Sequence, residues 1–333
     1  MMRIGVMSAA HVHTASYVEC LKASPGVELI GIADDDHARG REFAAAHGIH
    51  LFADYHALLA EKPDGVVICC ENTRHRAMTE MAAAAGAHVM CEKPLATSME
   101  DGRAMIRACK VAGVNLMTAF PMRFSPAARE VKAALDRGDL GAIRCANCTN
   151  QGYNPDYLRP WFTQKELSGG GAAIDHTVHV VDMLRWFMGA EVTEVYAEID
   201  NLFYRDRIQV DSAGLVMMAF DNGVFATLDC SWSRPSFYVT WGNVKIDLIC
   251  ERGLLQTDYF IQNITVYRGD LQRPQWQNWG SNIDQMMVNE FIASIRDRRA
   301  PFVTGEDGLR AAEVALAAYR SAEMHQPVAL PLA

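Results

Sequence analysis

Short apolar runs alternate with helical stretches over the first 120 residues, and no other feature constrains the fold as much. Strands are expected at residues 3–7, 27–33, 65–70, 87–91 and 114–119. Helices are expected at residues 15–23, 37–46, 73–85 and 99–112, with Thr73 and Ser98 as N-caps of the last two. Parallel strands need long crossover connections, and helices supply them. Residues 1–121 therefore predict a doubly wound α/β domain with a parallel sheet.

The pattern changes after Pro121. One helix is expected at residues 126–136, and strands at residues 142–150, 192–199, 213–220, 224–231, 244–250, 254–257 and 263–267. Asp221-Asn222-Gly223 separates two of these strands and is a strong hairpin signal. A helix near residues 175–189 should pack on this sheet, and helices at about 283–296 and 305–324 should end the chain. Residues 122–333 thus predict an α+β domain with an open, mainly antiparallel sheet. The helices at the end of the chain are compatible with packing on either domain, including the first.

Length and charge narrow the class of protein. A chain of 333 residues suits two domains better than one core. No run approaches the ~18 apolar residues that a membrane span needs, and the N-terminus reads as a strand rather than a signal peptide. The net charge is −9, with no basic block for nucleic acid, and the nine cysteines lie mostly in apolar segments. We expect a cytoplasmic enzyme without nucleic-acid or membrane partners.

The turn after the first expected strand departs from the G-x-G-x-x-G pattern. In that pattern the glycines let the backbone approach a pyrophosphate at a helix N-terminus. Ser8, Ala10 and His13 occupy the three glycine positions. Small side chains at the first two keep the turn feasible, whereas His13 is bulky where close helix packing is expected. His11 and His13 are either replacements for pyrophosphate contacts, groups that reach toward substrate, or helix N-terminal histidines without a ligand.

Asp34 ends the second expected strand and supports a dinucleotide site. A carboxylate at this point hydrogen bonds the adenosine ribose hydroxyls. Asp35 and Asp36 follow it, and three carboxylates would repel the 2′-phosphate of NADP. We therefore predict NAD rather than NADP. The alternative interpretation of the same residues is a polar turn.

Polar side chains follow three successive strands. They are Asn72, Thr73 and His75, then Glu92 and Lys93, and then Arg123. Cys91-Glu92-Lys93-Pro94 ends its strand abruptly and leaves a lysine at the carboxyl end. In an open α/β sheet this end binds ligands, so we expect one crevice to collect these groups.

A second motif lies downstream, where Gly169-Gly170-Gly171 precedes Asp175, His179 and Asp182. On a helix these three residues are spaced i, i+4, i+7 and share one face. A lysine and a histidine–carboxylate face are suitable for moving a proton while a hydride moves elsewhere.

Together these segments resemble the glucose–fructose oxidoreductase / inositol dehydrogenase (Gfo/Idh/MocA) family. The resemblance rests on Ala33-Asp34, Asn72-Thr73-Arg74-His75, Glu92-Lys93-Pro94, the glycine run with Asp175, His179 and Asp182, and Gly305-Glu306-Asp307-Gly308. It covers nearly the whole chain. It implies an N-terminal Rossmann domain that binds a nicotinamide dinucleotide and a C-terminal open sheet that pairs subunits, so a homodimer or homotetramer is expected.

The resemblance also implies roles. Lys93, Asp175 and His179 map onto the catalytic positions, and the substrate is a secondary alcohol or carbonyl of a sugar, inositol or related polyol. Cofactor contacts are expected from Ser8, Ala10, His11, His13, Asp34, Asn72, His75, Glu92 and Lys93. Position and charge add Arg123 and Arg159 as substrate contacts, and His176 is placed with them.

Two other functions are compatible with the same fold and cofactor site. A glycosidase or epimerase that recycles a bound NAD needs the same site, whereas a non-catalytic NAD-responsive regulator has no use for a proton relay. No metal is predicted. The spacing of His11, His13, His176 and His179 fixes no metal geometry, and Cys145 and Cys148 face opposite sides of their expected strand.

Overall fold

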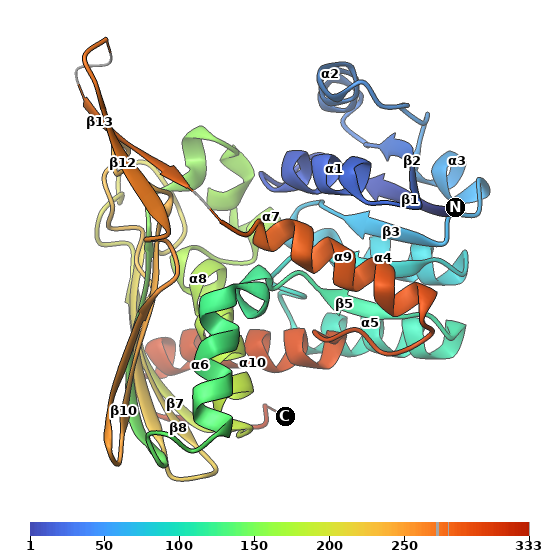
Figure 1. Cartoon of the computed structure of the whole chain (residues 1–333). Helices are drawn as coiled ribbons and strands as arrows, with labels where there is room; N and C mark the ends of the chain where they lie inside the picture. Colours follow the sequence, from blue (N-terminus) through green and yellow to red (C-terminus); the bar gives the residue numbers. More distant parts are fainter. Residues whose placement is uncertain (271–272, 279, 333) are drawn as a thin grey trace. The chain divides into compact units, whose positions relative to one another are not determined.

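Five parallel strands form a sheet in the order β2-β1-β3-β4-β5 (Figure 1). They are β1 (Met2–Met7), β2 (Val27–Ala33), β3 (Gly65–Ile68), β4 (His88–Cys91) and β5 (Leu116–Thr118). The predicted doubly wound parallel sheet is confirmed. The chain runs outward from β1 to β2 and then crosses to β3 on the other side of β1. This reversal creates the switch point where open α/β sheets bind ligands.

Helices connect these strands as α1 (Thr14–Ala23), α2 (His37–His47), α4 (His75–Ala84) and α5 (Met99–Ala112). Ser98 caps α5 as predicted, because its Oγ accepts the N–H of Asp101 at 3.1 Å. Thr73 is not a cap. It lies in the 3₁₀ turn η1 (Asn72–Arg74), and its Oγ1 donates to the carbonyl of Glu166 instead. The short helix α3 (Tyr55–Ala60) was not expected, since six residues give no clear periodic signal.

The computed structural model describes residues 1–270, 273–278 and 280–332. It contains two compact units. The first comprises Met1–Pro121, Asp156–Gly169 and Ile283–Ala312, and the second comprises Met122–Pro155, Gly170–Asn282 and Glu313–Ala333. Helix α9 (Ile283–Arg296) packs on α1 within the first unit, where Gln285 Nε2 donates to the carbonyl of Cys20. The segment with η4 (Pro160–Thr163) and α7 (Lys165–Ser168) belongs to this unit as well.

The second unit is built on a seven-stranded sheet in the order β11-β10-β6-β9-β8-β7-β14. Its strands are β6 (Ile143–Gly152), β7 (Val192–Asp200), β8 (Ala213–Phe220), β9 (Phe225–Asp229), β10 (Gly242–Cys250), β11 (Gly253–Asp258) and β14 (Val328–Ala329). All neighbours are antiparallel except β6 and β9, so the predicted mainly antiparallel sheet is confirmed. The hairpin at Asp221-Asn222-Gly223 joins β8 to β9 as expected. A separate hairpin pairs β12 (Asn263–Arg268) with β13 (Arg273–Asn278).

Helix α8 (Ala172–Met188) lies against β6 and β8, and α6 (Pro126–Asp136) packs beside α8. The last helix of the chain is α10 (Gly305–Met324). Helix α8 starts three residues before the expected Asp175, because side chains from elsewhere in the unit satisfy its first N–H groups. Asp211 accepts the N–H groups of Gly171 at 2.8 Å and Ala173 at 2.7 Å. Across the described ranges, none of the helices has both the length and the apolar character that crossing a membrane requires.

Candidate functional site

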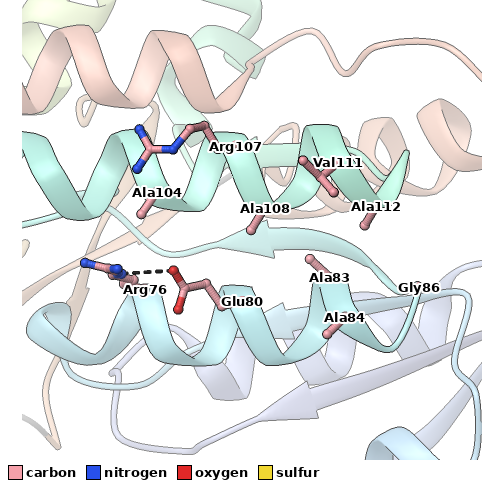
Figure 2. A pocket seen from close by; sticks show the side chains of 10 residues that line it. All are labelled: Arg76, Glu80, Ala83, Ala84, Gly86, Ala104, Arg107, Ala108, Val111 and Ala112. Atoms are coloured by element: carbon pink, nitrogen blue, oxygen red, sulfur yellow. Dashed lines mark hydrogen bonds and ion pairs between the residues drawn. The ribbon is translucent and has the colours of Figure 1, made fainter.

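A hollow of about 750 Å³ lies between α4 and α5 (Figure 2). Half of its lining residues are alanines, such as Ala83 on α4 and Ala108 on α5, and the lining also includes Arg107 and the ion pair of Arg76 with Glu80 at 2.9 Å. These side chains offer no combination of acid, base and nucleophile. None of the predicted site residues lines this hollow.

The predicted cofactor residues begin in the turn after β1. Ser8, at the first glycine position, has a φ of 74°, which lies in the left-handed region that glycine prefers. Its Oγ accepts the N–H of Ala10 at 3.2 Å and a hydrogen bond from Arg39 Nη2 at 3.2 Å. These two bonds hold the turn in a conformation that serine rarely adopts, and they explain how the chain folds here without glycine.

Much of the backbone of this turn is hydrogen bonded inside the first unit. N–H groups of the turn donate as follows: Ser8 to Ala33 O, Ala9 to Asp34 Oδ2 and His11 to Cys69 O. The carbonyl of Ala10 accepts from Trp161 Nε1 at 3.0 Å and from Arg159 Nε at 3.1 Å. Arg159, predicted as a substrate contact, therefore lies against the turn of the Rossmann unit. The role of Trp161 had no signal in the sequence, since it comes from a contact between distant segments.

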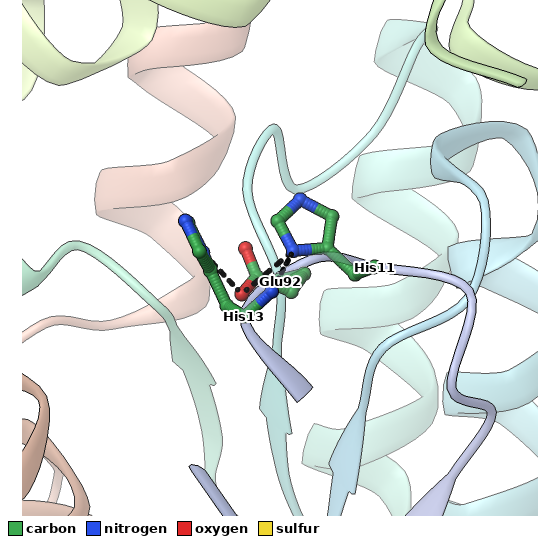
Figure 3. A group of neighbouring side chains, drawn as sticks. All are labelled: His11, His13 and Glu92. Carbon is green, nitrogen blue, oxygen red and sulfur yellow. Dashed lines mark hydrogen bonds and ion pairs between the residues drawn. The ribbon is translucent and has the colours of Figure 1, made fainter. Parts of the chain in front are cut away.

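His13 stands at the third glycine position, and its helical backbone (φ −78°, ψ −12°) has no need of glycine. Its Nδ1 lies 3.0 Å from Glu92 Oε1, and the Nδ1 of His11 lies 3.4 Å from the same oxygen (Figure 3). Glu92 Oε2 accepts the N–H of Lys93 at 3.0 Å. Glu92 and His11 are buried, whereas 39% of the His13 side chain is exposed.

Charge explains this cluster. Burial alone would raise the pKa of Glu92, but the charges of His11 and His13 outweigh it and hold that pKa far below its usual range. Burial lowers the pKa of His13, yet Glu92 more than compensates, and the pKa of His13 is raised above its ordinary value. The turn thus places a readily protonated imidazole beside a buried carboxylate.

Asp34 directly follows β2, and its fully buried side chain accepts four hydrogen bonds. Oδ2 accepts from Ala9 N at 2.7 Å and Arg39 Nε at 2.9 Å, and Oδ1 accepts from Asp36 N at 2.9 Å and Arg39 Nη2 at 2.7 Å. A carboxylate has about four acceptor positions, so a ribose hydroxyl has to displace one of these donors. Arg39 was not predicted as a site residue, although its place five residues after Asp34, at the start of a helix, was the available signal in the sequence.

More charges surround this pair. Arg39 Nη1 lies 3.3 Å from Glu71, and Arg74 contacts both Glu71 and Asp35. Asp34, Asp35 and Glu71 are therefore three carboxylates beside two guanidinium groups. These five groups have a net charge of one negative unit, and they lie where the adenosine ribose is expected.

Asn72 and His75 are both buried and bind backbone. Asn72 Nδ2 donates to the carbonyl of Ser168 at 2.9 Å. His75 Nδ1 faces the carbonyls of Pro94 at 3.0 Å and Leu95 at 3.3 Å, so Nδ1 carries the proton. Burial lowers the pKa of His75, and the ring is neutral near neutral pH. A cofactor contact by either residue stays a prediction.

Lys93 lies two residues after the end of β4 in the first unit, where it is buried and followed by the cis peptide to Pro94. The other predicted catalytic residues, Asp175 and His179, lie on α8 in the second unit. Joint action of Lys93 and His179 on one substrate stays a prediction.

On α8, Asp175 is buried and held by two neighbours. Its Oδ2 accepts from Trp232 Nε1 at 3.4 Å and lies 3.4 Å from Nε2 of His176. His176 is buried as well, and its carbonyl accepts from Asn150 Nδ2 at 3.0 Å. His179, one turn further along the helix, is partly exposed. The helix therefore places Asp175 and His179 on one face, as the spacing predicts.

Asp182 on the same helix binds Arg123. Arg123 Nε donates to Oδ2 at 2.8 Å and Nη2 donates to Oδ1 at 2.6 Å, and both side chains are buried. The guanidinium also lies 5.9 Å from the ring of Trp186. This bidentate pair fixes the segment before α6 to α8, and a substrate contact by Arg123 stays a prediction.

Comparison with known proteins identifies the family. Residues 2–120 match the oxidoreductase family described by its NAD-binding Rossmann fold, and residues 128–256 match the GFO/IDH/MocA C-terminal domain. D-xylose 1-dehydrogenase (NADP(+)) 2 of Haloferax volcanii is 32% identical over 236 residues, which are 70% of this chain and 70% of that protein. This chain belongs to the Gfo/Idh/MocA family. Myo-inositol 2-dehydrogenase of Thermotoga maritima, 29% identical, covers 99% of this Gfo/Idh/MocA chain and 98% of its own length.

A solved structure supports the same fold for this Gfo/Idh/MocA protein. GenD2 from gentamicin A biosynthesis, crystallised in complex with NAD, has a TM-score of 0.89 at 24% identity and covers 99% of this chain and 97% of its own. The predicted family, fold class and enzyme class are confirmed. The chain is an oxidoreductase with an NAD-binding Rossmann domain.

Proposed function

We propose that this chain transfers a hydride between NAD and a secondary alcohol or carbonyl of a sugar, inositol or related polyol. Its membership of the Gfo/Idh/MocA oxidoreductases is the observation that carries this proposal. The names of the related proteins support the substrate class, since they refer to myo-inositol and D-xylose. Residues 1–121 would form the NAD-binding domain, and residues 122–333 the domain for substrate binding and oligomerisation.

The first unit fits a nicotinamide dinucleotide. Helix α1 follows β1 at the switch point of the sheet, where its N-terminal end favours negative charge. Because several N–H groups of the turn are used internally, recognition of the pyrophosphate would rely on side chains, above all the imidazole of His13. Ser8, Ala10 and His11 would complete this contact, and Asn72, His75, Glu92 and Lys93 would line the cofactor edge. When bound, NAD supplies the hydride acceptor.

We propose a preference for NAD over NADP. The negative charge left by Asp34, Asp35 and Glu71 beside Arg39 and Arg74 disfavours a 2′-phosphate. A ribose hydroxyl, in contrast, has donor and acceptor character and is compatible with a carboxylate–guanidinium pair.

Three residues would carry the proton chemistry. During oxidation His179 removes the hydroxyl proton, since imidazole is the side chain best suited to exchange protons at neutral pH. Lys93 donates a hydrogen bond to the same oxygen and stabilises the negative charge that develops there. Asp175, fixed by Trp232, balances the positive charge of this pair.

Arg123, Arg159 and His176 are proposed as substrate contacts. Asp182 accepts from Nε and Nη2 of Arg123, and this bidentate pair fixes the position of the guanidinium. His176 and Arg159 each also have a structural contact, with Asp175 and with the carbonyl of Ala10.

We also propose that the chain is a homodimer or homotetramer. Leu215 and Met217 on β8 and Phe225 on β9 are exposed on adjacent strands of the seven-stranded sheet. An exposed apolar face of this kind is typical of a subunit interface. A cytoplasmic location agrees with the nine cysteines, all of them described, none of which forms a disulfide.

The first experiment is a titration with NADH, followed by energy transfer from tryptophan to the nicotinamide, with NADPH in parallel. Saturable binding of NADH, tighter than that of NADPH, supports the cofactor assignment. A screen of sugars and polyols then identifies the substrate, and release of one NADH per product distinguishes a dehydrogenase from an epimerase. The absence of binding by either dinucleotide would contradict the proposal and favour a regulator.

Replacement of His179 by alanine tests the proton chemistry. The turnover number should fall by about 10²–10⁴, which is the usual contribution of general acid–base catalysis. His47→Ala is the matched control, because His47 also pairs with a carboxylate, that of Glu19, on the surface. Equal turnover in wild type and His179→Ala would assign the base to another residue.

A further inference from the structure

We propose that His11, His13 and Glu92 form a binding site for a divalent transition-metal ion, with Zn²⁺ as the best match. One ligand atom from each residue lies within 4.8 Å of the other two, and the described residues contain one such group. Two imidazole nitrogens and a carboxylate oxygen are ligands that suit Zn²⁺ and its neighbours in the first transition row. The sequence did not predict this site because Glu92 is distant from the two histidines along the chain.

The distances between the ligand atoms suit a metal ion. Zinc lies about 2.0–2.2 Å from nitrogen and oxygen ligands, so neighbouring ligand atoms are about 3.3–3.6 Å apart at tetrahedral angles and about 2.8–3.1 Å apart at right angles. Glu92 Oε1 lies 3.0 Å from Nδ1 of His13 and 3.4 Å from Nδ1 of His11. Both rings turn one nitrogen toward the carboxylate and the other away from it (Figure 3).

Nδ1 of His11 takes part in two short contacts. The backbone N–H of His13 lies 3.2 Å from this nitrogen, and an oxygen of Glu92 lies 3.4 Å from it. A cation held between the imidazole nitrogen and the carboxylate oxygen, whether a proton or a metal ion, favours this close approach. A metal ion bound by Nδ1 of His11 and by Glu92 would take the place of the proton there.

The surroundings of these ligands also resemble those of a metal site, because one ligand is oriented by a hydrogen bond and an entry path is present. Glu92 Oε2 accepts the N–H of Lys93, and this bond orients the carboxylate in the way that outer partners orient metal ligands. His11 and Glu92 are buried, while the partly exposed ring of His13 leaves an entry path. Three protein ligands leave at least one coordination position for water or for an oxygen of a ligand.

This site goes beyond the proposed hydride transfer, which needs no metal ion. It is tested on the full chain without NAD, after treatment with a chelator, by titration with Co²⁺ and with Zn²⁺. We expect one ion per chain and visible d–d absorption from bound Co²⁺. Loss of an outer partner costs about 10–100-fold in metal affinity, so loss of a ligand in His13→Ala should cost at least that much.

His13→Ala is the main variant because its side chain is partly exposed, and Glu92→Gln is the second. His47→Ala is the control, since it removes another histidine that pairs with a carboxylate, and it should bind the ion as wild type does. Substoichiometric binding in wild type, or equal affinity in His13→Ala, would overturn the proposal. Titration of wild type with NADH reports on the hydride-transfer proposal independently, so failure of one is distinguishable from failure of the other.

Discussion

At the scale of single residues, the hydrogen bonds of Asp34 bring a guanidinium group to the carboxylate that follows the second strand. The carboxylate at the end of β2 is present as the sequence suggests, but its four acceptor positions are used by two backbone N–H groups and by Arg39. Arg39 is therefore held beside the carboxylate that we propose binds the adenosine ribose. Removal of the carboxylate releases this guanidinium.

Asp34→Ser should shift the cofactor preference toward NADPH. The variant removes a negative charge and leaves Arg39 to bind a 2′-phosphate, so the ratio of the NADH to NADPH dissociation constants should rise by about tenfold or more, an effect of ~1.4 kcal/mol. Fluorescence titration with both dinucleotides measures this ratio. The control is Asp36→Ser, which retains a helix-capping side chain at the start of α2. An unchanged ratio in Asp34→Ser would refute the assigned role of Asp34.

His75 should make folding stability depend on pH. Burial lowers its pKa in the folded protein, while in the unfolded chain the pKa is about 6.5. Below this value the unfolded state binds the additional proton, so the stabilisation is present above about pH 6.5 and is lost as the pH falls. The loss approaches about 1.4 kcal/mol per pH unit until the folded pKa is reached.

The variant His75→Asn removes this titration and retains a donor toward the carbonyl of Pro94. Its unfolding free energy should fall less than that of wild type between about pH 7.5 and 5.5. Chemical denaturation at several pH values within this range gives both slopes. Parallel slopes for the two proteins would show that His75 does not titrate as described.

At the scale of elements, helix α8 depends on residues outside itself. Its N-cap Gly171 has no side chain, and a Cβ there would lie 1.9 Å from the carbonyl oxygen of Asp211. Asp211 instead accepts the N–H groups of Gly171 and Ala173, and Tyr319 donates to Asp211 at 2.7 Å. Burial raises the pKa of Asp211 despite these hydrogen bonds. The beginning of the helix that carries Asp175 and His179 is thus fixed by long-range contacts.

Loss of this cap should destabilise the second unit. Asp211→Ala leaves two N–H groups without their acceptor and should lower the unfolding free energy by about 2–3 kcal/mol. Tyr319→Phe removes one hydroxyl and should cost about 1 kcal/mol. Chemical denaturation measures both, and a larger effect of Tyr319→Phe would be inconsistent with Asp211 as the main cap.

At the scale of the whole molecule, one face of the seven-stranded sheet exposes apolar side chains that a second copy of the chain could cover. Met217 and Phe225 are 51% and 54% exposed on neighbouring strands. A double variant with glutamate at both positions should dissociate the proposed oligomer, because burial of two carboxylates in an apolar interface is unfavourable. Light scattering after size-exclusion chromatography gives the mass.

The control for this prediction is Val111→Glu, which places the same charge at an 89% exposed position on α5. It should leave the mass of the oligomer unchanged. A double variant that keeps the wild-type mass would show that subunits pair through another surface, and a wild-type mass of one chain would exclude the oligomer.

The amino-acid sequence by itself determined most of the elements, the fold class and the family. Apolar periodicity and caps such as Ser98 are local, so β2, α5, α8 and both final helices were expected close to their observed positions. The same reasoning identified Lys93, Asp175 and His179 as candidates, because each stands in a short motif at the end of a strand or on a helix face.

Only the tertiary structure decided which groups meet. The pairing of Arg123 with Asp182, and of Glu92 with two histidines, depends on side chains that distant segments bring together. The same holds for Trp161, whose segment joins the first unit although it follows residue 121. Local pattern encodes backbone conformation, whereas these contacts depend on chain packing over long sequence separations, and packing is what sets the charge and the hydrogen bonds of the site.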